Sequence, residues 1–110
     1  MSNYHEPYEV LGEKARNISR ALNSLKEEIE AIDWYNQRVE ASSDPELKAI
    51  MAHNRDEEIE HACMALEWLR RNMDGWDEEL RTYLFTSVPV TDVEEADGQS
   101  GDGRLNIGKL

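Results

Sequence analysis

The tetrapeptide Ser42-Ser43-Asp44-Pro45 decides the fold, because it separates two long helical patterns. Asp44 has the short carboxylate that suits a helix N-cap, and proline is favoured at the first helical position after it. We therefore predict a second helix from Pro45 to about Met73. A break of only four residues places two helices side by side, so they are expected to form an antiparallel hairpin.

The helix before this break is predicted over residues 8–41, with a length of about 50 Å. Its apolar side chains recur at steps of three, four or seven residues, which is typical of a long packed helix. These side chains are Leu11, Ile18, Leu22, Leu25, Ile29, Ile32 and Val39. After the second helix, Asp74 is expected to cap a short third helix from Trp76 to about Phe85. The predicted fold class is all-α.

The composition restricts the possible partners. A chain of 110 residues suffices for one domain with a modest core. Its formal net charge of −12 repels nucleic acid and anionic membranes, and it attracts cations. No apolar run approaches the roughly 20 residues of a membrane span. A single cysteine, Cys63, cannot form an internal disulfide, so an intracellular setting is expected.

Glu58-x-x-His61 is the candidate metal motif, because residues three apart on a helix are surface neighbours. On a helical wheel the motif lies in the middle of a stripe whose two ends are apolar. This stripe contains Leu47, Met51, Asn54, Glu58, His61, Ala65 and Leu69. On the first helix, Glu28 precedes Ser43 by fifteen residues, and Glu58 follows Ser43 by fifteen. In an antiparallel hairpin the two carboxylates should therefore lie level with each other.

One chain supplies only half of a di-iron site. In di-iron carboxylate bundles two helices each give a Glu, and the other two each give Glu-x-x-His. This chain has no second Glu-x-x-His, so we predict a two-fold dimer of hairpins with four helices around one axis. Its four carboxylates would neutralise two divalent ions and favour iron over structural zinc. Taken alone, the motif has a simpler alternative, an ordinary solvated Glu–His pair.

Polar positions on the first helix leave two interpretations open. Glu27, Glu30 and Trp34 share the face opposite the apolar stripe, either as a solvated acidic face or as a transient cation site. Tyr35 lies seven residues after Glu28. It either hydrogen-bonds a liganding carboxylate or packs as a core tyrosine.

The second helix carries two further groups. On spacing alone, the ridge of His53, Glu57 and Glu60 is better explained as solvated surface than as a cation site. A second apolar strip lies on the far side of the same helix. It contains Ile59, Cys63 and Leu66, and an additional apolar face implies oligomer contacts beyond a dimer.

The C-terminal part divides the chain into a helical domain over residues 1–90, a flexible linker over 91–104 and a terminal peptide over 105–110. A fourteen-residue linker of this composition reaches about 20 Å. In the peptide, Leu105, Ile107 and Leu110 are apolar residues that follow a polar stretch. Such side chains can bind pockets on a partner protein, although a frayed terminus is the alternative.

Several segments of the chain resemble the encapsulated ferritins. They are His5-Glu6-Pro7, Asp33-Trp34-Tyr35, Asp44-Pro45-Glu46-Leu47, Ala52-His53-Asn54-Arg55-Asp56-Glu57-Glu58, Leu66-Glu67-Trp68-Leu69-Arg70-Arg71-Asn72 and Leu80-Arg81-Thr82-Tyr83-Leu84-Phe85. The terminal Leu105-Asn106-Ile107-Gly108-Lys109-Leu110 resembles the peptide that loads cargo into encapsulin nanocompartments. Lys109 departs from that pattern, because a small polar residue is common there.

The resemblance implies that two hairpins dimerise into a ferritin-like four-helix bundle. The dimers would assemble into a ring-shaped decamer, with di-iron centres at the dimer interfaces. Its catalytic metal ligands would be Glu28, Glu58 and His61 from each chain. It also implies an iron-uptake site at Glu27 and Glu30 beside Trp34, a place near the centre for Tyr35, and an outer cation site at His53, Glu57 and Glu60. The shell protein would be the partner, and the location would be the lumen of an encapsulin nanocompartment in the prokaryotic cytoplasm.

The expected activity is that of a ferroxidase, which oxidises Fe(II) to Fe(III) for storage inside the shell. One alternative is another di-iron oxidase or peroxidase on a similar bundle. A second alternative is a cargo protein that binds iron without turning it over.

Overall fold

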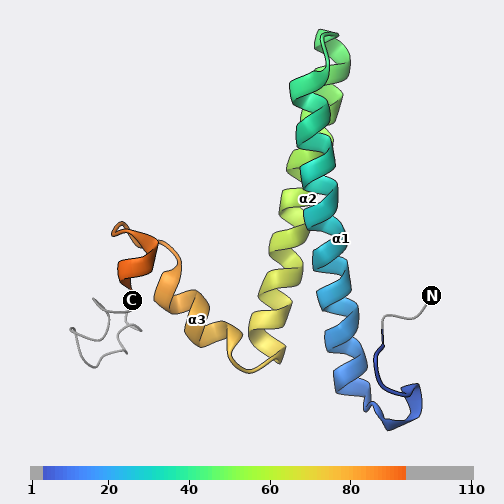
Figure 1. The fold of residues 1–110 in the computed structure, drawn as a ribbon, viewed down its shortest axis with the longest axis vertical. Coiled ribbons are helices and arrows are strands. Elements are labelled where there is room, and N and C mark those ends of the chain that lie inside the picture. Colours follow the sequence, from blue (N-terminus) through green and yellow to red (C-terminus); the bar gives the residue numbers. More distant parts are fainter. Residues whose placement is uncertain (1–3, 94–110) are drawn as a thin grey trace. The chain divides into compact units, whose positions relative to one another are not determined.

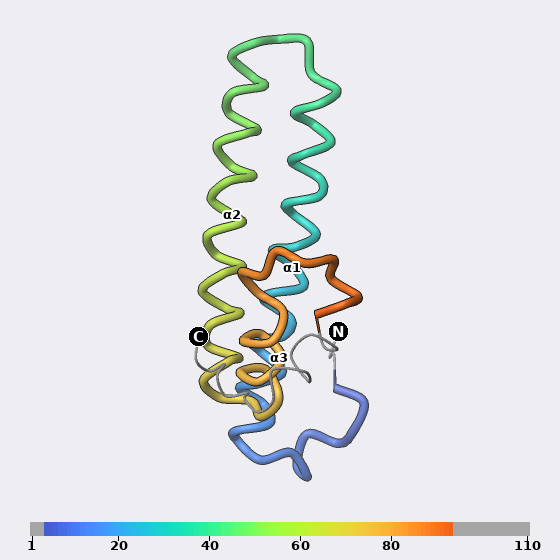
Figure 2. Tube along the Cα trace, turned by 90° about the vertical axis from the view of Figure 1, so that its left-hand side faces the viewer, coloured from blue at the N-terminus to red at the C-terminus, as the bar shows by residue number. Residues whose placement is uncertain are grey.

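The structure, a computed structural model, describes residues 4–93. Over this range the chain is helical and has no strand. Its elements are η1 (Tyr8–Val10), α1 (Glu13–Ala41), α2 (Pro45–Asn72), α3 (Trp76–Tyr83) and η2 (Val90–Asp92). α1 and α2 lie side by side and are joined at one end by a short turn (Figures 1 and 2). The predicted all-α hairpin and the short third helix are confirmed. None of the helices in residues 4–93 is long and apolar enough to span a membrane.

Asp44 caps α2 as its sequence position predicts. Its Oδ1 accepts hydrogen bonds from the backbone N–H groups of Glu46 at 2.9 Å and Leu47 at 3.1 Å. These two groups have no acceptor within the helix, because the first turn of a helix lacks preceding carbonyls. The cap and Pro45 together explain why α2 starts where it does.

Replacing Asp44 by alanine should lower the free energy of unfolding by about 1 kcal/mol, because two backbone donors lose their acceptor. Urea denaturation followed by circular dichroism measures the change. Asp74→Ala is the matched control, since Asp74 makes no cap hydrogen bond, and it should change stability by less than about 0.5 kcal/mol. Equal losses in the two variants would contradict the capping role.

The first long helix begins five residues later than predicted, at Glu13 instead of Tyr8. Arg16 accounts for the difference. Its guanidinium lies over the Tyr8 ring, 3.6 Å from the centroid, and its Nη2 donates to the Tyr8 carbonyl at 2.8 Å. That carbonyl would accept from Gly12 in a continuous helix. With Arg16 on this carbonyl, residues 8–10 form the separate turn η1, and Leu11 and Gly12 are extended.

The hairpin leaves much of its apolar surface uncovered. Among the described residues, only Leu69 and Val93 are buried hydrophobic side chains. Two members of the apolar stripe predicted on the first helix, Leu22 and Ile29, are exposed. Further exposed apolar side chains along the two helices are Trp34, Leu47, Ile50, Ile59, Met64 and Trp68. Two packed helices can cover only one side of each other, so this surface is available for further chains.

By contacts, the chain divides into one unit over residues 1–72 and a second unit from residue 73 onward. In the second unit, Asp74 was expected to cap α3, and this prediction is wrong. The N-cap is Gly75, whose φ of 102° is accessible mainly to glycine, and no side chain caps the helix. The predicted linker overlaps η2 at Thr91 and Asp92, and its remainder lies outside the described residues apart from Val93. The predicted terminal peptide, residues 105–110, also lies outside them.

Candidate metal centre

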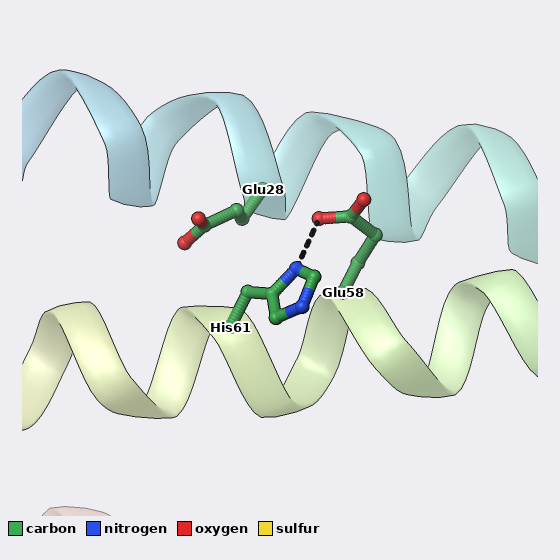
Figure 3. Close-up of side chains that lie close together, drawn as sticks. All are labelled: Glu28, Glu58 and His61. Carbon is green, nitrogen blue, oxygen red and sulfur yellow. Dashed lines mark ion pairs between the residues drawn. The ribbon is translucent and has the colours of Figure 1, made fainter.

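The structure brings Glu28, Glu58 and His61 together near the middle of the hairpin. α1 provides Glu28, and α2 provides Glu58 and His61, as Figure 3 shows. One ligand atom from each side chain lies within 4.8 Å of the other two. Within residues 4–93 this is the only group of three or more His, Cys, Asp or Glu side chains arranged in this way. The level placement of Glu28 and Glu58, predicted by counting from the turn, agrees with this geometry.

The cluster is partly exposed to solvent. His61 Nδ1 lies 3.5 Å from Glu58 Oε1, and the two side chains are 43% and 27% exposed (Figure 3). A carboxylate and an imidazole at this separation can turn toward a common ion. Their partial exposure allows an ion to reach them from solvent. It also leaves the opposite side of such an ion without protein ligands from this chain.

Glu28 carries the clearest sign that a cation belongs here. Its Oε1 is buried and accepts no hydrogen bond within the described part of the chain. A buried polar atom without a partner costs free energy, and for a carboxylate the cost is larger than for a neutral group. A metal ion ligated by this oxygen would remove that cost. Two carboxylates and one imidazole are a ligand set that suits Fe(II), so the residues present fit iron.

Glu67, a carboxylate further along α2, provides a contrast. Arg70 and Arg71 donate hydrogen bonds to it at 2.7 Å, and these bonds lower the pKa of Glu67 to about 2. Its negative charge is therefore already balanced by protein cations. Neither Glu28 nor Glu58 has an ion pair with arginine or lysine within residues 4–93, so their charge is left for another cation.

The residues predicted to form an uptake site lie on α1 and face solvent. Glu27, Glu30 and Trp34 are all exposed, and no hydrogen bond or ion pair joins them. Tyr35 is half-buried and makes no hydrogen bond to Glu28 or Glu58. Its ring instead lies 5.1 Å from the Arg38 guanidinium carbon, in a cation–π contact.

Two members of the predicted outer ridge on α2 lie close together. His53 Nε2 lies 3.4 Å from Glu57 Oε2, and both side chains are exposed. Glu60 is exposed as well and does not complete a three-ligand group with them. The residues predicted to bind a partner, Leu105, Ile107 and Leu110, lie outside the described residues.

Sequence reasoning assigned no role to Arg55 or Asn36, although these two side chains join the two long helices. Arg55 Nη1 donates to Asn36 Oδ1 at 3.0 Å. Arg55 lies in one of the segments that resemble the encapsulated ferritins, whereas Asn36 does not. The two residues are nineteen positions apart, so no spacing signal links them.

Comparison with known proteins gives concordant results. Residues 3–87 match the EncFtn-like family. The chain is 58% identical to the "Ferritin-like protein" of Thermotoga maritima, over 97% of this chain and 96% of the relative. It is also 58% identical to the "Encapsulated ferritin-like protein" of Rhodospirillum rubrum, over 96% of this chain and 86% of the relative.

A solved structure shares both fold and sequence with the chain. It is the crystal structure of a protein from Nitrosomonas europaea, with a TM-score of 0.78 and 56% identity, and the match covers 81% of this chain and 98% of that one. The fold, the length of the family match and the level of identity therefore all indicate the same family. The chain belongs to the EncFtn-like family of encapsulated ferritin-like proteins.

Proposed function

We propose that the protein is a ferroxidase, which takes Fe(II) as substrate and releases Fe(III). The convergence of Glu28, Glu58 and His61, with a buried oxygen of Glu28 left without a partner, carries this proposal. The family membership supports an iron-related function, because the relative from Rhodospirillum rubrum is named as an encapsulated ferritin-like protein. The ligands are oxygen and nitrogen donors with two negative charges, a set that stabilises Fe(III) more than Fe(II).

Two chains complete the centre. Three ligands from one chain leave an iron ion under-coordinated on its solvent side. A two-fold axis through the exposed side of the cluster supplies the same three ligands again, which gives four carboxylates and two imidazoles for two ions. Ile29 follows Glu28 directly in sequence and is 55% exposed, so it provides apolar surface for this contact. The dimer is a four-helix bundle, and its further assembly as a ring-shaped decamer uses the remaining apolar strip of α2.

The chemistry balances over the two ions. Each Fe(II) gives up one electron, and the two electrons reduce dioxygen, with two protons, to hydrogen peroxide. Peroxide is the alternative oxidant for the same pair, and it is reduced by two electrons and two protons to water. The protein supplies geometry and charge: four carboxylates hold the two ions before oxidation and offset part of the charge gained after it.

The exposed acidic side chains have supporting roles in this proposal. Glu27 and Glu30, beside Trp34, form a weak uptake site that raises the local concentration of Fe(II). His53, Glu57 and Glu60 form an outer cation site, for which the 3.4 Å approach of His53 to Glu57 gives partial support.

The lumen of an encapsulin shell is the location that we propose for the protein. A relative from Myxococcus xanthus, 32% identical over 89% of this chain, is named as an encapsulin nanocompartment cargo protein. By analogy, the helical domain over residues 1–90 works in the lumen of an encapsulin shell in the prokaryotic cytoplasm. Residues 91–104 act as a tether, and Leu105, Ile107 and Leu110 dock on the shell protein.

Stopped-flow absorbance after mixing the protein with Fe(II) in air tests the proposed activity. The wild type should show a fast rise of ferric absorbance, and Glu58→Ala and His61→Ala should each slow it at least about tenfold, because each removes a ligand from both halves of the centre. Glu40→Ala, which removes an exposed carboxylate from α1, is the matched control and should keep the wild-type rate. Wild-type rates in both ligand variants would contradict the assignment. Iron binding without the fast phase in the wild type would favour a non-catalytic cargo protein.

A further inference from the structure

Arg55 forms a directional link between the two long helices. Its Nη1 donates to Asn36 Oδ1 on α1 at 3.0 Å, and its Nε donates to Asp56 Oδ1 on α2 at 3.1 Å. The Arg55 side chain is 27% exposed, whereas its two partners, Asn36 and Asp56, are exposed. A planar guanidinium held at two of its edges has a defined orientation, which the flexible ammonium of a lysine lacks. The link therefore connects a defined point of α1 to a defined point of α2.

The candidate centre requires such a reference point. Glu28 and Glu58 lie on different helices, so any sliding of α1 along α2 changes the distance between their carboxylates. Apolar side chains between helices tolerate small slides, because their packing energy depends only weakly on direction. Metal–ligand bonds tolerate about 0.2 Å. Arg55 precedes Glu58 by three residues, which is less than one helical turn. Asn36 follows Glu28 by eight residues, about 12 Å along α1, so the link lies beside Glu58 and acts on Glu28 through the helix.

The same link keeps the guanidinium away from the metal ligands. Arginine and glutamate three apart on a helix are positioned to form an ion pair. Arg55 instead binds Asn36 and Asp56, and the near partner of Glu58 is His61 at 3.5 Å. An arginine on Glu58 would compete with a metal ion for its oxygens. The observed partners of Arg55 leave the Glu58 carboxylate free of that competition.

We propose that Arg55 and Asn36 are a positioning pair, which sets the level of Glu28 against Glu58 and prepares the hairpin for metal. The identity of the metal rests on the proposed function, whereas the link itself does not. Neither residue touches the reacting ions in this proposal. Their effect is on the affinity of the centre and on the rigidity of the helices around it.

Co(II) binding, followed by visible absorbance, tests the effect on the centre. Arg55→Ala and Asn36→Ala should each weaken Co(II) binding about tenfold, a typical loss when a group that orients a ligand is removed. The double variant should lose no more than either single variant, because both changes remove the same bond. Arg55→Lys should recover only part of the affinity, since a lysine can still donate to Asn36 but is not held at two edges as the guanidinium is. Arg20→Ala is the matched control. Within residues 4–93, Arg20 bonds only to Asn17 and Glu13 of its own helix, and its loss should leave affinity unchanged.

Hydrogen exchange in the metal-free protein provides the independent measurement. Arg55→Ala should speed amide exchange around Glu28 and Glu58 about tenfold, whereas Arg20→Ala should not. Unchanged exchange and unchanged Co(II) affinity in Arg55→Ala would overturn the proposal, and so would additive losses in the double variant. If Glu58→Ala left Co(II) binding intact, the metal centre itself would be wrong, and the exchange rates alone would decide whether the link fixes the hairpin.

Discussion

Fe(II) added without oxygen should shift the protein toward the dimer by about four orders of magnitude in the dissociation constant. The expectation follows from the half-site in each chain. Two copies of Glu28 and Glu58 crowd four negative charges at the shared centre, so the metal-free dimer is opposed by repulsion. An ion that binds only the dimer stabilises it by about 2.7 kcal/mol when its free concentration is about 100 times its dissociation constant. Two ions double this free energy.

Native mass spectrometry or sedimentation velocity, with and without Fe(II), measures the shift. His61→Ala should reduce the response strongly, because it removes one ligand from each half of the centre. Glu40→Ala should respond as the wild type does, since its carboxylate is exposed and outside the cluster. An identical distribution of oligomers with and without Fe(II) would argue against a centre shared between chains.

The parts of the fold that the sequence predicts are those with local causes. The turn can be predicted because Asp44 and Pro45 act on the first helical turn that follows them. In the structure Asp44 caps α2, and Pro45 is its first residue. The first residue of α1 cannot be predicted from such local signals. It depends on the Arg16 guanidinium, which reaches back eight residues to the Tyr8 carbonyl and ring. A helical pattern over residues 8–41 says nothing about such a contact.

For the candidate site too, the sequence predicts what depends on helix geometry and does not predict what depends on side-chain conformation. Both helices rise equally per residue, so counting from the turn brings Glu28 level with Glu58 without any knowledge of side-chain conformation. The link between Arg55 and Asn36 depends on the conformation of a long side chain, and no periodicity encodes it. Periodicity also predicts an apolar stripe but does not say what covers it. Leu22 and Ile29 belong to the stripe and are exposed in the single chain.

Replacing Glu28 by methionine should have opposite effects on metal-free stability and on iron binding. Methionine has a similar volume, fills the same space and has no charge, so it removes the buried oxygen that lacks a partner. In the presence of a chelator the free energy of unfolding should rise by about 1–3 kcal/mol. Under anaerobic Fe(II) the order should reverse, because the wild type gains the free energy of binding and the variant has lost a ligand.

Urea denaturation followed by circular dichroism, at one protein concentration with chelator and again with Fe(II), measures both effects. Glu27→Met is the matched control, since Glu27 is the adjacent carboxylate of the same helix and is exposed. Its metal-free stability should stay within about 0.5 kcal/mol of the wild type. A loss of metal-free stability in Glu28→Met would mean that the carboxylate supports the hairpin by itself. A gain of metal-free stability in both variants would reflect the added apolar surface. A gain in Glu28→Met alone would show that the Glu28 carboxylate lowers the stability of the metal-free protein, as expected of a residue retained because it binds iron.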